Sequence, residues 1–204
     1  ETEGFTVAVP PPPPAVQILD NGDAGVTIPD DWNTTTGGSY YGSDWRFSRL
    51  PDDAAGEARF EFTGLEAGSY EVSVTWIEGP GRRTDAVYDI YDDAVLAASS
   101  SPVSLLNAPT ADHVEGGRNF QVVAGSVSIS SGTLVVSLAN DSTAWTNVDA
   151  VRIEFLAPLG PDTTAPTADL ADPADGSSLD PATLNARGYI EVTFADSGDG
   201  LDAA

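Results

Sequence analysis

The sequence predicts an all-β fold: an antiparallel β-sandwich of the jelly-roll type, followed by part of a second, immunoglobulin-like β-sandwich. Three observations support this prediction. Apolar and polar residues alternate in many short segments, the turn formers Gly, Asp, Asn and Pro separate these segments, and no segment has a convincing helical period. Short strands that follow one another over about 140 residues without intervening helices are typical of antiparallel sandwiches.

Two segments show the alternation most clearly. In "EARFEFTGL" and in "GSYEVSVTWIEG" apolar residues recur at every second position, so each segment is expected to form a strand with one buried face. Five further segments, "AVYDIYD", "NFQVVAG", "SVSIS", "TLVVSLAN" and "VDAVRIEF", continue the pattern. The residues predicted to face the core are Ala58, Phe60 and Phe62 of the first segment and Tyr70, Val72, Val74 and Trp76 of the second.

Changes in composition divide the chain into four parts. Residues 1–14 hold the short apolar run "FTVAV" and five consecutive prolines, which form a semi-rigid spacer. Residues 15–156 contain the predicted sandwich, and residues 157–164 are a linker that is rich in Pro and Thr. Residues 165–204 show one further strand pattern but cannot bury a core of their own without disulfides, so they are expected to be an incomplete sandwich.

The charge of the chain restricts its partners. It has 32 acidic and 8 basic side chains, all of the latter Arg, and a formal net charge of −24. Nucleic acid and membrane insertion are excluded, because no basic patch can release counterions and no apolar run is long enough to span a bilayer. The absence of Cys and Met excludes disulfides and thiol chemistry, and it suits a protein exposed to oxidation in an extracellular or cell-surface location.

The sequence does not predict an enzyme. The only histidine, His113, lies in the turn-rich segment "NAPTADHVEGG", with neither a nucleophile elbow nor a second histidine nearby to build a triad or a zinc site. Carboxylate pairs occur by chance among 32 acids, so no particular pair points to glycoside hydrolysis.

A structural calcium site is one interpretation of the turn "DNGDAG". In a jelly roll the first and last strands commonly pair, which would bring Asp20 and Asp23 close to Asp149 at the start of "DAVRIEF". Asp149 has the strand parity of the apolar Val151 and Ile153, so its carboxylate is expected to be buried and to need a partner. That partner is either a set of turn backbone amides or a calcium ion, and both alternatives remain open at this point.

The aromatic segment "GGSYYGSDWR" suggests a sugar-binding surface. Planar aromatic faces flanked by polar side chains bind sugars, whereas the aromatics of small sandwiches more often pack in the core, and both alternatives are kept. The candidate exposed platforms are Trp32, Trp45 and Trp145, and the candidate neighbours are Tyr41, Asp44, Arg46 and Arg82.

Several motifs, in order, resemble the C-terminal domain of golvesin and xanthan lyase. They are "ILDNGDAG", Trp32, "YYGSDWR", "AGSYEVSVTW", "AVYDI" and "DAVRIEF", and they cover residues 16–155. The resemblance implies a β-sandwich module classed as carbohydrate-binding-like. One departure is Phe120, where the family usually has Trp. The tail "DTTAPTADLADPADGSS" is similar to the opening of bacterial immunoglobulin-like repeats in large surface proteins.

Three functions are consistent with these patterns. The first is a non-catalytic, extracellular carbohydrate-binding or adhesion module of a large surface or secreted protein, of which this chain is a processed form or a piece. The second is a fibre or stalk in which the N-terminal strand of one copy completes the C-terminal sandwich of the next by strand addition. The third is an accessory domain of a polysaccharide lyase or another secreted hydrolase.

Overall fold

In the computed structural model the chain divides between Leu159 and Gly160 into two units, which are described separately. The structure describes residues 15–50, 56–160, 167–172 and 180–195. No helix among these residues is long and apolar enough to cross a membrane.

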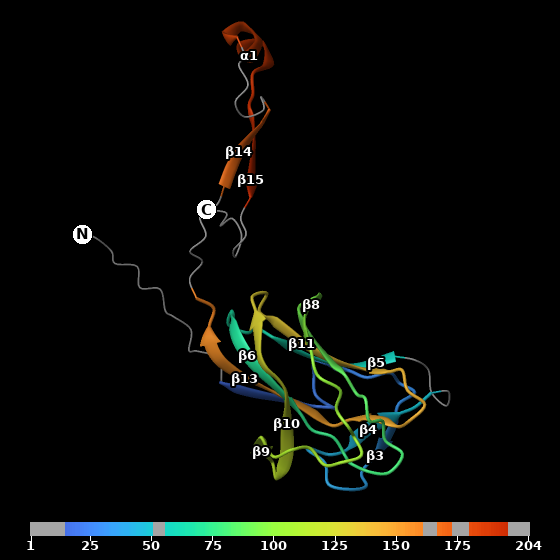
Figure 1. Ribbon diagram of the computed structural model, residues 1–204. Helices are drawn as coiled ribbons and strands as arrows, with labels where there is room; N and C mark the ends of the chain where they lie inside the picture. The colour runs from blue at the N-terminus through green and yellow to red at the C-terminus, as the bar shows by residue number, and fades with distance from the viewer. Residues whose placement is uncertain (1–14, 51–55, 161–166, 173–179, 196–204) are drawn as a thin grey trace, which may run out of the picture. The chain divides into compact units, whose positions relative to one another are not determined.

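Two five-stranded antiparallel sheets form the two layers of the first unit (Figure 1). One sheet has the order β1-β13-β6-β10-β9, and the other has the order β2-β5-β11-β7-β8. The strands of the first sheet are β1 (Val16–Asp20), β6 (Gly68–Val74), β9 (His113–Glu115), β10 (Arg118–Ile129) and β13 (Ala150–Pro158). Those of the second are β2 (Val26–Thr27), β5 (Gly56–Thr63), β7 (Tyr88–Asp92), β8 (Val95–Ser99) and β11 (Thr133–Asn140).

A smaller three-stranded sheet extends the unit, and its strand β4 begins with Trp45 and Arg46, the last two residues of the predicted aromatic segment. Its order is β12-β4-β3, with β3 at Asn33–Thr35, β4 at Trp45–Ser48 and β12 at Thr146–Val148. The central strand β4 pairs antiparallel with both neighbours, so Trp45 lies opposite Thr35 and Phe47 lies opposite Asn147.

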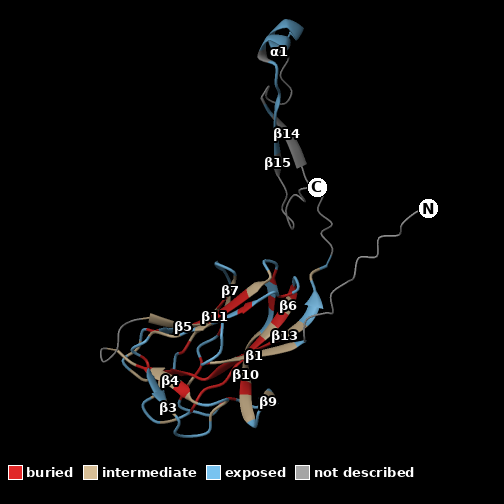
Figure 2. Cartoon of the chain, turned by 180° about the vertical axis from the view of Figure 1, so that it is seen from behind, coloured by how far each residue is buried: buried red, intermediate tan, exposed pale blue. Residues whose placement is uncertain are grey.

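The predicted alternation produces the core between the two large sheets, where buried residues concentrate (Figure 2). The all-β antiparallel prediction is therefore confirmed. The core-facing residues predicted from both segments are at most 3% exposed, in agreement with their strand parity. The opposite face of β6 is also covered, since Ser73 is fully buried beside Arg152 of β13.

One strand is longer than the sequence pattern predicts. The segments "NFQVVAG" and "SVSIS" belong to the single strand β10, which pairs with β6 with register shifts between Val122 and Ala124 and between Ala124 and Val127. Gly125 lies within the second irregular region. A glycine inside a strand commonly marks such a bulge, so the residues that resemble a turn in the sequence bend a continuous strand instead.

The second unit contains one feature that the sequence analysis missed. Strands β14 (Thr167–Asp172) and β15 (Glu191–Ala195) pair antiparallel, and a short helix, α1 (Pro181–Arg187), lies between them in sequence. The expectation that no segment is helical is therefore wrong. The signals were local: Asp180 caps the first turn by accepting from the amides of Ala182 and Thr183 at 2.9 and 3.0 Å, and Gly188 ends it with a φ of 75°.

The immunoglobulin-like assignment of this unit stays a prediction, because two paired strands and a helix do not define that fold. The N-terminal run from Phe5 to Val9 lies outside the described residues.

The turn between β10 and β11 is held by Asp92 at the end of β7. Its carboxylate accepts hydrogen bonds from the backbone amides of Ser130 and Ser131, both at 3.0 Å, and from both serine hydroxyl groups. Burial raises the pKa of Asp92, but the hydrogen bonds outweigh burial, so its net pKa lies below the ordinary value. The charged carboxylate therefore stabilises the folded state.

Replacing this carboxylate should remove an acid-sensitive part of the stability. Asp92→Ala is expected to lower the free energy of unfolding by about 1 kcal/mol at neutral pH, a modest value because the hydrogen bonds are solvent-exposed. The folded-state pKa lies below the unfolded one, so this stabilisation is present above about pH 4 and is lost as the pH falls through the folded-state value.

Urea unfolding of both proteins from about pH 7 to about pH 2 measures the difference. The neighbouring exposed acid provides a control, Asp93→Asn, which should change little. A difference that stays constant down to the lowest pH would contradict this role of the Asp92 charge.

Candidate functional site

Three aromatic rings pack in a row on the small β12-β4-β3 sheet and its edge. The ring centroids of Trp45 and Phe47 are 5.1 Å apart, and those of Phe47 and Trp145 are 5.2 Å apart at an interplanar angle of 71°. The last pair is T-shaped, the arrangement that the charge distribution of aromatic rings favours. The three rings therefore form one continuous aromatic group.

Two arginines cover the tryptophans at the ends of this row. The guanidinium carbon of Arg82 lies 4.7 Å from the ring centroid of Trp45, and that of Arg49 lies 4.3 Å from the ring centroid of Trp145. Arg82 is also fixed by its Nε, which donates to the carbonyl of Ile77 at 2.9 Å. We call Trp45, Phe47, Arg49, Arg82 and Trp145 the aromatic–arginine cluster.

The predicted platform residues are brought together only in part. Trp145 is half-buried at the edge of the cluster, whereas Arg46 alternates with Trp45 and Phe47 along β4 and forms an ion pair with Asp44 at 3.6 Å. Trp45 belongs to the cluster but is only 6% exposed, so its prediction as an exposed platform is wrong, because β3, Phe47 and Arg82 cover it.

Trp32 and Tyr41 lie outside the cluster. Trp32 is 3% exposed and packs in the main core, so its prediction as an exposed platform is also wrong. Tyr41 is half-buried, and its ring packs edge-on against the fully buried Phe120 at 5.7 Å. Tyr41 therefore helps to cover Phe120, the residue that departs from the family pattern.

A second candidate site lies where β1 ends and β13 begins. The two strands pair antiparallel with Asp20 opposite Ala150, which confirms the expected pairing of the first and last strands of the sandwich. The backbone amide of Asn21 donates to the carbonyl of Asp149 at 2.9 Å, and its side-chain amide donates to Asp44 Oδ1 at 2.5 Å. We call Asp20, Asn21, Asp44 and Asp149 the aspartate cluster.

The cluster keeps one carboxylate deep in the protein. Asp149 is 1% exposed, and its Oδ2 accepts a hydrogen bond from the backbone amide of Tyr41 at 2.9 Å. Burial raises the pKa of Asp149 to about 7, and the charges of Asp20 and Asp44 add to the increase. Burial also raises the pKa of Asp20, to which Asp23 contributes.

Two of the three predicted acids, Asp20 and Asp149, lie close enough for the charge of Asp20 to act on Asp149, and Asp23 adjoins Asp20. Asp23 stabilises the turn, since its Oδ2 accepts from the backbone amide of Asp20 at 2.9 Å. Sequence analysis missed Asn21 and assigned Asp44 to the sugar-binding surface instead, because their approach depends on the folding of residues 37–44 onto the turn after β1. Gly42 permits that approach: its φ is +66°, and a Cβ added there would lie 1.9 Å from Asp20 Oδ2.

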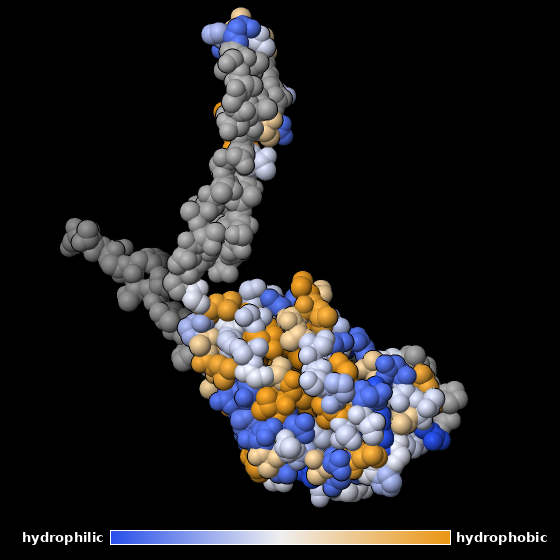
Figure 3. All heavy atoms as spheres, viewed as in Figure 1, coloured by the Kyte–Doolittle hydropathy of each residue, from blue (hydrophilic) through white to orange (hydrophobic). Residues whose placement is uncertain are grey.

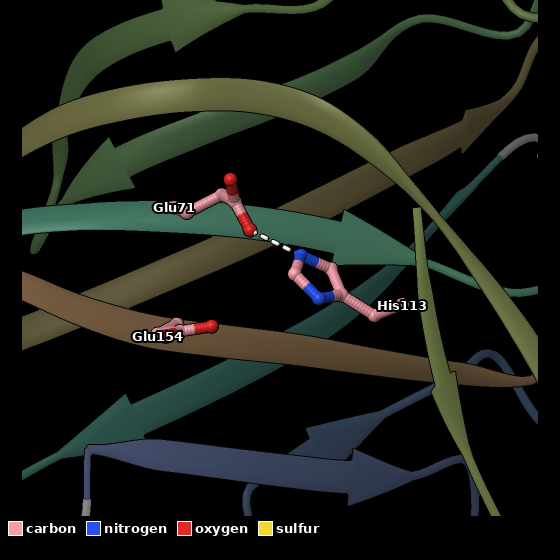
Figure 4. A group of neighbouring side chains, drawn as sticks. All are labelled: Glu71, His113 and Glu154. Atoms are coloured by element: carbon pink, nitrogen blue, oxygen red, sulfur yellow. Dashed lines mark hydrogen bonds and ion pairs between the residues drawn. The ribbon is translucent and has the colours of Figure 1, made fainter. Parts of the chain in front are cut away.

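A third polar group lies on the face of the first sheet that is turned away from the core. Glu71 of β6, His113 of β9 and Glu154 of β13 point toward one another (Figure 4). Among the described residues, they are the one group of acids and histidine whose potential ligand atoms all lie within 4.8 Å of one another. His113 Nε2 and Glu71 Oε1 are 2.5 Å apart.

A buried arginine supplies the positive charge that this group needs. The side chain of Arg152 is 5% exposed, and its guanidinium approaches Glu154 at 2.6 Å, Glu115 at 3.6 Å and Glu71 at 3.8 Å. Because the guanidinium of Arg152 already lies among these carboxylates and forms ion pairs with them, we interpret the group as an ion-pair network that joins β6, β9 and β13 rather than as a metal centre.

The described residues thus define an antiparallel β-sandwich module with clustered aromatic and acidic side chains at its end. Sequence comparison identifies the family: the model of the Golvesin C-terminal domain matches residues 17–155, and the chain belongs to this family. No curated protein matches the chain in sequence.

Several solved structures are similar to this chain, and the first of those described next shares its fold. The xanthan lyase of Paenibacillus superposes with a TM-score of 0.57 and 21% identity over 70% of this chain, which spans 13% of the length of that protein. The family 35 carbohydrate-binding module of Abf62 from Cellvibrio japonicus has a TM-score of 0.47 and 13% identity over 70% of this chain and 97% of its own. A Podospora anserina β-(1,4)-mannanase with such a module has a TM-score of 0.45 and 16% identity over 78% of this chain and 31% of its own.

Removal of the central cation of the ion-pair network should be costly. Arg152→Met is expected to lower the free energy of unfolding by about 3 kcal/mol, because it leaves three glutamates facing one another around an apolar side chain. Urea unfolding at neutral pH measures the change. The control is Arg59→Met, whose pair with Glu57 is 35% and 40% exposed and should contribute less than about 1 kcal/mol. Equal effects of the two substitutions would contradict a structural role for the network.

Proposed function

We propose that this protein is a non-catalytic carbohydrate-binding module of an extracellular or cell-surface protein and that the aromatic–arginine cluster is its sugar-binding surface. Membership of the Golvesin C-terminal domain family supports the proposal, as does the neighbouring fold of a polysaccharide lyase. The observation that carries it is the half-buried Trp145, whose ring lies at the edge of a rigid aromatic row with Arg49 over it.

The cluster has the parts that sugar recognition requires. A sugar ring packs its apolar face on Trp145, and the guanidinium groups of Arg49 and Arg82 donate hydrogen bonds to hydroxyl groups at the ring edge. Arg49 lies over the Trp145 ring, so a sugar that stacks there displaces this guanidinium, and the lost cation–π contact costs about 0.5–2 kcal/mol.

The proposal places the chain as an accessory part of a larger carbohydrate-active or adhesive protein. The glutamates of the network around His113 form ion pairs with Arg152, and the aspartate cluster presents a carboxylate that is 1% exposed, so we assign a catalytic role to neither group. A module of this kind would hold its parent protein against a polysaccharide.

Sugar binding should depend on Trp145. Trp145→Ala is expected to weaken binding at least tenfold in a glycan array followed by isothermal titration calorimetry with the polysaccharide that the array selects, because the stacking surface is lost. The matched control is Tyr91→Ala, which truncates another half-buried ring that lies under an arginine, Arg59, at 5.7 Å. Thermal unfolding of both variants shows whether the fold is kept.

Two results would contradict the proposal. One is an absence of binding by the wild-type chain to any polysaccharide or oligosaccharide on the array. The other is an equal affinity of Trp145→Ala, Tyr91→Ala and the wild-type chain, which would place the sugar elsewhere on the sandwich.

A second candidate function is self-association by strand addition, which the C-terminal unit favours. Its sheet has only two strands among the described residues, and an isolated two-stranded sheet is marginally stable in water. Tyr189, Ile190 and Val192 at the start of β15 are 60%, 57% and 36% exposed. A third strand from another copy would cover apolar side chains and pair with a free edge.

This alternative predicts concentration-dependent assembly. Sedimentation velocity of the full chain over a wide concentration range should show growing oligomers, and Ile190→Asp together with Val192→Asp should abolish them by placing charge at the edge. The control is Val95→Asp in β8, which is 70% exposed and belongs to the first unit. Apolar and polar side chains are mixed over the face of that unit that is seen in Figure 3. A monomer at every concentration would contradict strand addition, and assembly lost equally in Val95→Asp would place the contact elsewhere.

A further inference from the structure

Three buried oxygen atoms of the aspartate cluster have no hydrogen-bond partner among the described residues. They are Asp20 Oδ1, Asn21 Oδ1 and Asp149 Oδ1. Asn21 and Asp149 are 6% and 1% exposed, so water cannot readily solvate these atoms from outside. A buried acceptor without a partner costs about 1–3 kcal/mol, and a charged one costs more, so three on neighbouring residues need a common explanation.

The orientation of Asn21 indicates what this explanation is. Its Nδ2 donates to Asp44 Oδ1, which fixes the amide so that the carbonyl oxygen is directed away from Asp44. Asp149 is arranged in the same manner, since one oxygen accepts from the Tyr41 amide and the other is left without a donor. A hydrogen bond thus fixes one polar atom of each of these side chains, while the other oxygen has no hydrogen-bond partner among the described residues.

The charge balance of the cluster is negative. It contains three carboxylates. One of them, Asp44, forms an ion pair at 3.6 Å with the neighbouring Arg46, and the side chains of Arg46 and Asp44 are 31% and 24% exposed. Arg118 acts on Asp149 electrostatically, but its Nη2 donates to the carbonyl of Trp76. Asp20 and Asp149 therefore lack a hydrogen-bonded cation among the described residues, in a chain whose formal net charge is −24.

We propose that the aspartate cluster binds one calcium ion, with Asp20, Asn21 and Asp149 as its side-chain ligands and Asp44 as the residue that orients Asn21. All donors are oxygens, and the cluster has no imidazole or thiolate, which selects a hard cation over zinc or copper. Calcium also accepts a mixture of carboxylate, amide and solvent oxygens in flexible geometry, which suits ligands from two separate segments.

The ion would have a structural role. It would fasten the turn after β1 to the start of β13, and through Tyr41 and Asp44 it would fasten residues 37–44 to both. This role does not require a bound sugar, and it predicts greater stability of the folded chain in calcium when no polysaccharide is present.

The test uses the full chain, stripped of metal with EDTA and titrated with calcium chloride by isothermal titration calorimetry. One ion per chain is expected, and each tenfold excess of calcium over its Kd should lower the unfolding equilibrium constant about tenfold. Asp149→Asn and Asp20→Asn should weaken calcium affinity at least tenfold. Asp93→Asn, the same charge change at an exposed position, should bind as the wild type does.

The sign of the stability change separates calcium binding from simple hydrogen bonding. In EDTA, Asp149→Asn should be at least as stable as the wild type because it removes a buried negative charge, whereas in calcium it should be less stable. If Asp149→Asn fails to fold, the affinity of Asp20→Asn decides the question, because Asp20 is only half-buried.

Two outcomes would overturn the proposal. One is an absence of binding heat and of stabilisation up to about 10 mM calcium, which exceeds the Kd of about 1 mM of the weakest extracellular calcium modules. The other is equal calcium affinity of Asp149→Asn, Asp20→Asn and Asp93→Asn, which would place the ion outside the aspartate cluster.

Discussion

The antiparallel pairing of β1 with β13 is the contact on which the rest of the first unit depends. It joins the two ends of the sandwich, and its register places Asp20 opposite Ala150 and Leu19 opposite Val151. A shift by one residue would turn the core-facing side chains of β1 toward solvent, so burial fixes this register. With the register fixed, the turn after β1 necessarily lies against Asp149, and both the aspartate cluster and the position of residues 37–44 follow from it.

The sequence predicts those features that depend on local periodicity or on a general topological rule. Phe60 and Val72 are buried because alternate residues of a strand share a face, and the approach of Asp20 to Asp149 follows from the pairing of first and last strands. The burial of Trp45 could not be predicted in this way, because it requires the pairing of β4 with β3 and the position of Arg82, a residue distant in sequence.

The ion-pair network around Arg152 shows the same limit. The face of β13 from which the Arg152 side chain projects could be predicted from strand alternation. The glutamates that Arg152 contacts could not, because they depend on the register between β13 and β6 and on the placement of the short strand β9. Position 120, where this chain has Phe and the family usually has Trp, could likewise be interpreted only from the structure, in which the ring of Tyr41 packs edge-on against Phe120. Long-range register, rather than residue type, therefore separates the predictable part of the site from the rest.

The use of arginine as the only basic residue fits the way in which this acidic chain is held together. Arg83 is 6% exposed at its side chain, and its guanidinium bonds to Asp85, to Asp141 and to the carbonyl of Ala139, which ties a loop to the end of β11. A planar guanidinium with five donors can satisfy several acceptors at once, whereas an ammonium group is strongly hydrated and loses more by burial. Because buried arginines of this kind pair with acids inside the fold, their charge does not offset the acids at the surface, which stays strongly negative.

Residues 37–44 link the aspartate cluster to the aromatic–arginine cluster. Asp44 accepts a hydrogen bond from the side-chain amide of Asn21 and forms an ion pair with Arg46. Trp45 follows Asp44 directly as the first residue of β4. The carbonyl of Gly37 accepts a hydrogen bond from Trp45 Nε1 at 2.7 Å, so the segment is fastened at its start as well as at its end. A change in the charge balance at Asp20 and Asp149 therefore acts on the same short segment that positions Trp45 under Arg82. The order of this segment, rather than direct contact, is the physical means by which the aspartate cluster can influence the aromatic–arginine cluster.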